Sequence, residues 1–309
     1  MSIPQKLGYL AVQVRHLDKW RRFNADMLDL PLSESADGGF GLQLDGARQR
    51  VMVEPGERDD VAAVGLEFAD DTSLESFRSK LQAGGVAIEE GNAALAARRG
   101  VRRLLGFDDP SGIRLEAFVD PAPAAKPFAS RFFPDGFHAD RLGFGHVVLV
   151  VPDLRVAEDF YCGVLGFVVT ERLKVKLGPA DVGGIFLHCN RRHHSLALFA
   201  VPARKRLHHF MLQAHDIGDV GRAYERFQQH RVPFSLGLGQ HPAPDNTVSF
   251  YAATPSGFDI EIGAAGHEIE PVGWQERQLT QVSIWGHKPT MRLKLGMMRQ
   301  VLAQRLGLH

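Results

Sequence analysis

The sequence predicts an α+β protein of two tandem domains. Each domain is expected to contain two βαβββ units whose strands form one curved mixed sheet around a cavity. Three observations lead to this prediction. The chain has 309 residues, enough for two domains of about 150 each. The same motifs occur twice in the same order. Within each copy, segments with strand-like alternation of apolar residues flank segments with helical spacing.

The repeat is visible at both ends of the two copies. LGYLAVQV from Leu7 resembles LGFGHVVLVV from Leu142, and FDDPSGIRLEAF resembles YAATPSGFDIEIG. In the second pair, Pro-Ser-Gly predicts a turn, and the strand that follows carries Glu116 in one copy and Glu261 in the other. The offset grows from 135 residues at the first motif to 145 at the second, so the second copy carries a short insertion. A repeat of this length indicates domain duplication.

Each copy also contains a second helical pattern. DTSLESFRSKLQAGGV and DIGDVGRAYERFQQHRVP both open with Asp, carry apolar residues at helical spacing and end near Gly or Pro. A segment with four prolines, 121–136, is the predicted linker between the copies. We therefore expect an N-terminal domain over 1–133, a metal-binding domain over 134–288 and a helical tail over 289–309.

The tail is predicted to be helical because four apolar residues fall on one helical face, namely Leu295, Met298, Leu302 and Leu306. Such a helix packs on its own domain or on a neighbouring subunit. A helix on a membrane surface is the alternative, but it has no second anchoring signal.

Composition excludes several classes of partner. The 36 basic and 36 acidic side chains give a formal net charge of +0, so no basic field predicts binding to nucleic acid or to an anionic membrane. No apolar stretch approaches about 18 residues, so no membrane span is expected. The two cysteines, Cys162 and Cys189, lack CxxC spacing, which fits a reducing cytoplasm without disulfides.

Three residues on separate predicted strands form a candidate metal site. His146 lies in GHVVL, Glu261 lies in GFDIEIG, and a histidine pair, His208 and His209, lies in KRLHHFML. Neighbouring residues of a strand face opposite sides, so one histidine of the pair can share the site. Two histidines and one carboxylate leave half of an octahedral metal open, which is the arrangement of non-haem Fe(II) oxygenases. Singly, each residue has a structural interpretation, as a hydrogen-bonded core histidine or a surface glutamate.

The first copy is an internal control for this site. Alignment of the repeats places Ala11 opposite His146 and Ala63 opposite His209, whereas Glu116 matches Glu261. A general structural need for histidine would appear in both copies. We therefore expect the site to be functional in the second copy and absent from the first.

Further polar residues lie near this predicted site along the chain. HCNRRHHSLALF contains His193 and His194, and GQHPAPDN contains His241. A histidine can move protons near neutral pH, and the phenol of Tyr251 can donate to a substrate oxygen. A zinc site built from His188, Cys189 and His193 is the alternative for the first segment, although it lacks a regular ligand spacing.

Together these motifs resemble the type I extradiol ring-cleaving dioxygenases of the vicinal oxygen chelate superfamily, and within them the 2,3-dihydroxybiphenyl 1,2-dioxygenase group. The resemblance is carried by GHVVL, FLHCNRRHHSLA, KRLHHFML and SFYAATPSGFDIEIG, and it extends from LGYLAV to SIWGHK. It implies that His146, His209 and Glu261 bind Fe(II), with Mn(II) as the alternative metal. It also implies an enzyme that cleaves an aryl- or ring-substituted catechol with O₂ to a muconic semialdehyde-type product, in the degradation of aromatic compounds.

The resemblance also implies roles for residues around the metal. His194 falls at the acid/base histidine, His241 and Tyr251 at the pair that hydrogen-bonds a substrate oxygen, and Val148 and Phe186 at the pocket for the aromatic ring. The family commonly forms homo-oligomers. Two alternatives within the superfamily are a glyoxalase-type isomerase, which usually needs a fourth protein ligand, and a non-catalytic protein that binds an aromatic drug, which generally lacks the metal triad.

One departure from the family concerns the loop before Tyr251. Nine residues separate His241 from Tyr251, one more than the family's usual spacing, and the loop contains Pro242 and Pro244. This loop borders the substrate pocket in the family. The ring substituent of the catechol is therefore left open by the sequence.

Overall fold

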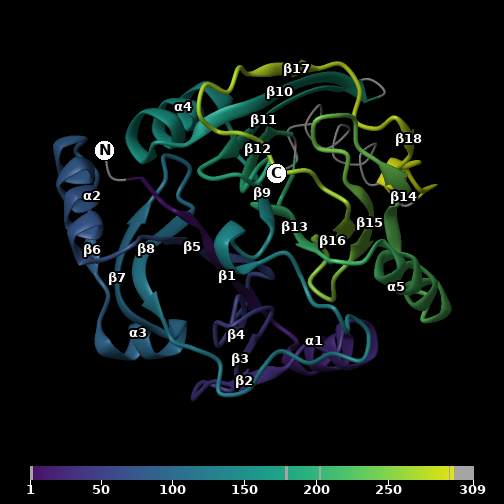
Figure 1. Cartoon of the computed structure of the whole chain (residues 1–309), viewed down its shortest axis with the longest axis horizontal. Helices are drawn as coiled ribbons and strands as arrows, with labels where there is room; N and C mark the ends of the chain where they lie inside the picture. Colours follow the sequence, from purple (N-terminus) through teal and green to yellow (C-terminus); the bar gives the residue numbers. More distant parts are fainter. Residues whose placement is uncertain (1–2, 178–179, 202, 292, 296–309) are drawn as a thin grey trace.

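A computed structural model of the chain describes residues 3–177, 180–201, 203–291 and 293–295. Its strands form two mixed sheets, one of eight strands in the N-terminal half and one of ten in the C-terminal half. Figure 1 shows the two sheets side by side, with the longer helices on their outer faces. The predicted α+β class and its two halves are confirmed.

The eight-stranded sheet contains two βαβββ units. The first unit comprises β1 (Lys6–Val14), α1 (Leu17–Phe23), the π-helical turn η1 (Asn24–Leu28), β2 (Leu32–Glu34), β3 (Phe40–Leu42) and β4 (Val51–Pro55). The second comprises β5 (Asp60–Glu67), α2 (Asp71–Ala83), β6 (Glu89–Glu90), α3 (Ala93–Arg99), β7 (Val101–Asp108) and β8 (Arg114–Pro121). The units join where β1 pairs with β5, so the strand order is β2-β3-β4-β1-β5-β8-β7-β6.

The ten-stranded sheet repeats this plan after the short helix η2 (Asp140–Leu142). Its first unit comprises β9 (His146–Val150), α4 (Leu154–Glu158), η3 (Asp159–Leu165), β10 (Val168–Leu177), β11 (Ala180–His188) and β12 (Leu196–Ala200). Its second comprises β13 (Leu207–Gln213), α5 (Ile217–Gln229), β14 (Phe234–Gln240), β15 (Val248–Ala253) and β16 (Asp259–Ala264). Two short strands, β17 (Arg277–Leu279) and β18 (Trp285–Gly286), form the two edges of this sheet. Its strand order is β17-β10-β11-β12-β9-β13-β16-β15-β14-β18.

The helix α2 forms because both its start and its inner face are specified locally. The Asp70 side chain accepts a hydrogen bond from the backbone N–H of Ser73, which completes a capping box. Leu74, Phe77 and Leu81 recur at helical spacing and are fully buried against the sheet. The helix predicted from DTSLESF is thus present.

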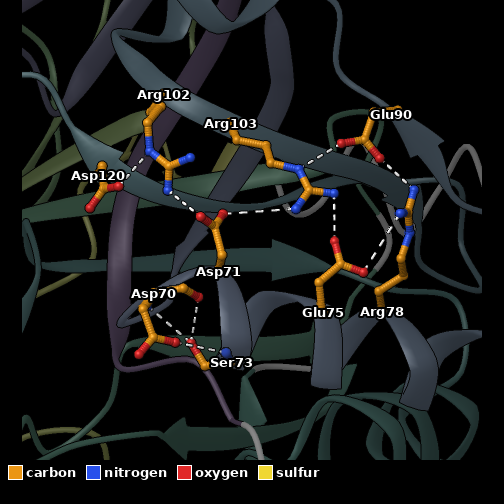
Figure 2. A network of polar contacts seen from close by, with 9 residues as sticks. All are labelled: Asp70, Asp71, Ser73, Glu75, Arg78, Glu90, Arg102, Arg103 and Asp120. Carbon is orange, nitrogen blue, oxygen red and sulfur yellow. Dashed lines mark hydrogen bonds and ion pairs between the residues drawn. The ribbon is translucent and has the colours of Figure 1, made fainter.

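The outer face of α2 is joined to the sheet by charged side chains. Figure 2 shows Arg103 of β7 between Glu75 of α2 and Glu90 of β6, with nitrogen–oxygen distances of 2.6 and 2.8 Å. Arg102 similarly bridges Asp71 and Asp120. Exposed pairs of this kind each contribute at most about 1 kcal/mol, so burial of the apolar face stabilises the helix more.

The helix α5 has the same construction in the second half. Asp216 caps its N-terminus by accepting from the backbone N–H of Gly218. Val220, Ala223 and Phe227 form its buried face. The prediction of a helix from DIGDVGRAYERFQQ is confirmed.

The two halves share one apolar core. The Phe23 ring meets Phe227 at 5.8 Å between centroids, and Trp20 meets Phe258 at the same distance. Phe144 donates its backbone N–H to the carbonyl of Leu7 at 3.2 Å, just before β9 begins. The segment 122–139 between the sheets contains no named helix or strand, as its prolines predicted. The boundaries 1–133, 134–288 and 289–309 stay predictions.

The register of the strands corrects one alignment between the repeats. In the first sheet Tyr9 pairs with Gly65, which pairs with Glu116. In the second, His146 pairs with Met211, which pairs with Glu261. Tyr9, rather than Ala11, is therefore the counterpart of His146. The motif alignment was wrong by two residues, because the Leu-Gly of the first copy lies inside β1, whereas the Leu-Gly of the second copy precedes β9.

Two remaining expectations concern membranes and the tail. None of the helices in the described part of the chain has the length and apolarity needed to cross a bilayer. Most of the tail predicted to be helical, including Met298, Leu302 and Leu306, lies outside the described residues.

Candidate active site

Three strands of the ten-stranded sheet bring the predicted metal ligands together. The Nε2 atom of His146 (β9) lies 3.0 Å from Oε2 of Glu261 (β16), and that of His209 (β13) lies 3.4 Å from it. The two Nε2 atoms are 3.3 Å apart. All three residues are buried. His209, not its neighbour His208, is the histidine of the pair that faces this cluster.

The triad fits a divalent metal ion. Neither oxygen of Glu261 has a hydrogen-bond partner among the described residues, although both are buried. A buried carboxylate that accepts no hydrogen bond costs several kcal/mol, and neutral imidazoles at 3.0 and 3.4 Å do not offset its charge, so a compensating cation is expected there. Two imidazole nitrogens and one carboxylate are borderline-to-hard donors that suit Fe(II) and Mn(II).

The charges of the triad are coupled. Burial would raise the pKa of the Glu261 carboxyl, but the imidazoles of His146 and His209 hold that pKa well below its usual range. Burial also lowers the pKa of His146, although Glu261 opposes this effect. An ionised carboxylate beside a neutral imidazole is the protonation state in which these groups bind a metal.

His194 lies directly against this triad. Its ring centroid is 4.1 Å from that of His146, with an angle of 30° between the planes. The Phe186 ring meets His194 edge-on at 5.0 Å between centroids. Burial, reinforced by His146 and His193, lowers the pKa of His194 well below its ordinary value. A neutral imidazole is thus available near the triad to accept a proton.

His241 and Tyr251 form a hydrogen-bonded pair near the other carboxylate oxygen of Glu261. The phenol oxygen of Tyr251 lies 2.9 Å from Nε2 of His241, which is 3.6 Å from Oε1 of Glu261. His241 Nδ1 donates to the Val282 carbonyl at 2.8 Å, because a carbonyl can only accept. Burial would lower the pKa of His241, but Glu261 and Asp245 raise it to about 9. Burial raises the pKa of Tyr251, so its phenol keeps its proton.

The two predicted ring-pocket residues lie beside these groups. Val148 is two residues from His146 on β9 and pairs with His209 across the sheet. Phe186 is half-buried on β11 and contacts both His194 and the ring of Phe199. The structure thus brings every predicted site residue to one place.

The N-terminal sheet has a different arrangement at the equivalent point. Glu116, the counterpart of Glu261, accepts from the Tyr9 hydroxyl at 2.5 Å and from Arg99 Nε at 2.6 Å. Ala63 stands where the second sheet has His209. Burial would lower the pKa of Arg99, but Glu116 raises it, so the guanidinium stays charged. A fixed side-chain cation compensates this buried carboxylate.

The comparisons with known proteins agree with this site. The model described as "Glyoxalase/Bleomycin resistance protein/Dioxygenase superfamily" matches residues 143–262, and "Dihydroxybiphenyl dioxygenase BphC D1" matches residues 7–56. The chain is 40% identical over 290 residues to a biphenyl-2,3-diol 1,2-dioxygenase of Paraburkholderia xenovorans. The alignment covers 93% of this chain and 96% of that protein. The chain belongs to the type I extradiol dioxygenases of the vicinal oxygen chelate superfamily.

Two further members of this extradiol dioxygenase family extend the likeness. An iron-dependent extradiol dioxygenase of Rhodococcus jostii is 34% identical over 93% of this chain and 97% of its own length. The crystal structure of a halotolerant catechol dioxygenase superposes with a TM-score of 0.87 at 32% identity, covering 96% of this chain and 97% of that one. The predicted family resemblance is thus confirmed.

The alternative zinc site does not form among the described residues. Those that could jointly hold a metal are His146 with His209 and Glu261, His193 with His194 and Asp245, and Asp135 with Asp216 and Asp219. Cys189 belongs to none of these groups, and its sulfur contacts the Ser195 hydroxyl at 3.8 Å instead.

Sequence reasoning missed one histidine of the site. The His287 ring lies 4.6 Å from His241 and 5.5 Å from Tyr251. Its nitrogens contact the hydroxyls of Ser249 and Ser283 at 3.2 and 2.6 Å. His287 follows β18 at the sheet edge, and the pairing of this segment with β14 brings it to the site. No local pattern in SIWGHK indicates this position.

Proposed function

We propose that this protein is an Fe(II)-dependent extradiol dioxygenase, which uses O₂ to open a substituted catechol beside its two hydroxylated carbons. The observation that carries the proposal is the buried triad of His146, His209 and Glu261, whose Nε2 and Oε2 atoms lie within 3.4 Å of one another. Two groups that can donate or accept protons lie beside it, namely His194 and the His241–Tyr251 pair. The expected product is a muconic semialdehyde or a related keto-enol acid. A ring-substituted catechol such as 2,3-dihydroxybiphenyl is the proposed substrate.

His146, His209 and Glu261 would hold the metal. When bound, Fe(II) would supply open coordination positions and the electron transfer that lets O₂ react with a closed-shell catechol. We favour Fe(II) over Mn(II) because the relative from Rhodococcus jostii is named as iron-dependent.

The remaining residues would bind the catechol and move its protons. Phe186 is half-buried beside His194 and offers apolar surface on which an aromatic ring can pack, and Val148, which is buried next to the triad, would form the wall behind that surface. Tyr251 keeps its proton and can donate it in a hydrogen bond to a substrate oxygen, while its own oxygen lies 2.9 Å from Nε2 of His241, which would hold the phenol in place. His194 is neutral and can accept a proton from the catechol, then return it when the product forms.

The triad also favours this function over the two alternatives. A glyoxalase-type isomerase would leave the paired His241 and Tyr251 without a role. A protein that only sequesters aromatic compounds would not require a buried carboxylate with two unpartnered oxygens. We also propose a cytoplasmic location, supported by two free cysteines, and a homo-oligomer, supported by exposed apolar side chains at Ile284, Trp285 and Met291.

Oxygen uptake tests the proposal. The protein is reconstituted anaerobically with Fe(II) and given catechol, 3-methylcatechol, 2,3-dihydroxybiphenyl or 1,2-dihydroxynaphthalene, while the visible spectrum is recorded. We expect one O₂ consumed per catechol with a coloured ring-fission product, and no uptake with hydroquinone, whose hydroxyls cannot chelate together. The order of rates defines the size of the ring pocket. Ferrous protein that consumes no O₂ with any of these diols would contradict the proposal.

A matched pair of variants tests the ligand assignment. Glu261→Ala should abolish metal retention, measured by elemental analysis after desalting, and with it turnover. Glu116→Gln changes the equivalent carboxylate of the other sheet and should leave the metal content unchanged. Wild-type metal content in Glu261→Ala would remove this residue from the site.

A further inference from the structure

A second group of buried polar side chains lies behind His194. Glu171 on β10 and His193 are 2% and 4% exposed, and neither has a role in the proposed function. Nε2 of His193 lies 3.4 Å from Oε2 of Glu171. Nδ1 of His193 lies 3.0 Å from Nδ1 of His194. These contacts connect Glu171 through His193 to His194, whose ring packs on His146.

An irregularity in β10 aims two neighbouring side chains at His193. Adjacent residues of a strand normally face opposite sides. The pairing of β10 with β11 shifts register between Val169 and Glu171, which places a bulge at Thr170. The Thr170 hydroxyl donates to the backbone carbonyl of His193 at 2.7 Å, while Glu171 faces the ring of the same residue. Both backbone and ring of His193 are therefore held.

The positions of the hydrogens follow from what each atom can accept. An ionised carboxylate has no proton to donate, so a lone pair on His193 Nε2 would repel Glu171, whereas an N–H there is attracted. Nε2 makes no hydrogen bond among the described residues, so its 3.4 Å contact with Glu171 is electrostatic. A neutral His193 with its proton on Nε2 has a lone pair on Nδ1. The short contact between the two Nδ1 atoms then requires the proton on Nδ1 of His194.

We propose that Glu171 and His193 are positioning residues that hold His194 in the tautomer with its proton on Nδ1 and its lone pair on Nε2. This inference rests on the proposed role of His194 as the acid/base group. A base must present a lone pair, and a neutral imidazole free to exchange tautomers presents it at a given nitrogen only part of the time. Glu171 acts on His194 through His193 and does not itself touch the substrate.

The opposite arrangement is chemically distinct and can be measured. If His193 were a cation paired with Glu171, both its nitrogens would carry protons. Its Nδ1 would then donate to Nδ1 of His194, which would leave the proton of His194 on Nε2. The tautomer of His194 therefore reports directly on the state of the pair.

Long-range ¹H–¹⁵N NMR of histidine-labelled, metal-free, full-length protein tests the inference. His194 is assigned by comparison with His194→Gln. We expect its Nδ1 in the protonated range and its Nε2 in the unprotonated range. In Glu171→Gln, which is nearly isosteric, the amide can either donate or accept, so His194 should populate both tautomers. In the Fe(II)-loaded variant kcat should fall about tenfold, with KM for the catechol within about twofold of wild type.

Two further variants complete the design. Glu171→Asp keeps an acceptor-only group and should restore the wild-type tautomer and most of kcat. Glu276→Gln removes an exposed carboxylate that pairs with Arg172, the residue after Glu171 on β10. This control should change neither the tautomer of His194 nor kcat. A protonated Nε2 on His194 in the wild type would overturn the inference. So would a Glu171→Gln variant with the wild-type tautomer, even if it were less stable.

The NMR measurement also separates this inference from the proposed function. The tautomer is measured without metal or substrate, so it can be confirmed in a protein that consumes no O₂ with catechols. Conversely, normal ring cleavage with the wrong tautomer would overturn the role of Glu171 and His193 alone.

Discussion

Tyr9 and His146 occupy the same position in the two sheets. Each pairs across its sheet with a residue that pairs in turn with a buried glutamate, Glu116 or Glu261. The duplicated fold therefore places a carboxylate at the same point twice. In one sheet an arginine and a phenol satisfy it, and in the other two imidazoles face it without satisfying it.

Arg99, the cation beside Glu116 in the N-terminal sheet, should be important for stability. Arg99→Met should leave Glu116 buried with the Tyr9 hydroxyl as its remaining partner, because Arg99 supplies the charge at 2.6 Å. Loss of one partner of a buried ion pair costs about 3–5 kcal/mol. Urea unfolding would measure the loss.

The double variant Arg99→Met with Glu116→Gln is its control. It removes both charges, so we expect it to recover part of the lost free energy of unfolding. The metal content of the folded protein should stay at the wild-type level in both variants. A double variant as unstable as the single one would contradict the assignment of the loss to an unpaired carboxylate.

His194→Ala should separate chemistry from binding. The ring packs on His146 but is not one of the three proposed ligands, so metal content and the anaerobic spectrum of the catechol complex should persist. Loss of a general acid/base group lowers turnover by about 10²–10⁴. Steady-state kcat measured by O₂ uptake tests this expectation, and an unimpaired rate would exclude His194 from proton transfer.

Gly145→Ala should disturb the site through the backbone. Gly145 has a φ of +145°, and a Cβ atom there would lie 1.8 Å from the carbonyl oxygen of Met211. Relief of this clash moves β9 away from β13 and so separates His146 from His209. We expect the protein to lose about 2–4 kcal/mol of stability, together with metal retention.

Gly163→Ala is the matched control, because a Cβ at that exposed glycine meets nothing within 4 Å. Its thermal unfolding and metal content should match those of the wild type. Normal metal content in Gly145→Ala would show that the site tolerates displacement of β9.

His188 should make the metal-free protein sensitive to acid. Burial, together with His193, lowers the pKa of His188 from 6.5 to about 4. Between these values the unfolded chain binds a proton that the folded protein does not, so stability falls as the pH drops from 6.5 towards 4 and changes no further below that range. The contribution is at most about 3 kcal/mol.

Urea unfolding of the metal-free protein at pH 7 and pH 4.5 measures this effect. The loss of free energy between the two values should be smaller in His188→Gln than in the wild type. His230→Gln replaces an exposed histidine and should keep the wild-type loss. Equal losses in His188→Gln and the wild type would contradict the prediction.

Local patterns in the sequence were sufficient for the helices and for two of the three proposed metal ligands, His146 and Glu261. The capping aspartates and apolar spacing predict α2 and α5, since a helix is specified by contacts between residues three and four apart. The motifs that contain His146, His209 and Glu261 indicate a metal site, because each carries a ligand-forming side chain on its own strand. The choice between His208 and His209 needed the resemblance, since alternation leaves the two faces equivalent.

Contacts between distant strands determined the rest. Alignment by motif placed Ala11 opposite His146, whereas ladder hydrogen bonds place Tyr9 there, because pairing and not local sequence sets the register of a strand. The bulge at Thr170, which turns Glu171 towards His193, is a property of the pairing between β10 and β11. His287 reaches the site through β18 at the sheet edge. A strand's own residues specify which side chains it carries, but the hydrogen bonds to its neighbours fix where those side chains meet.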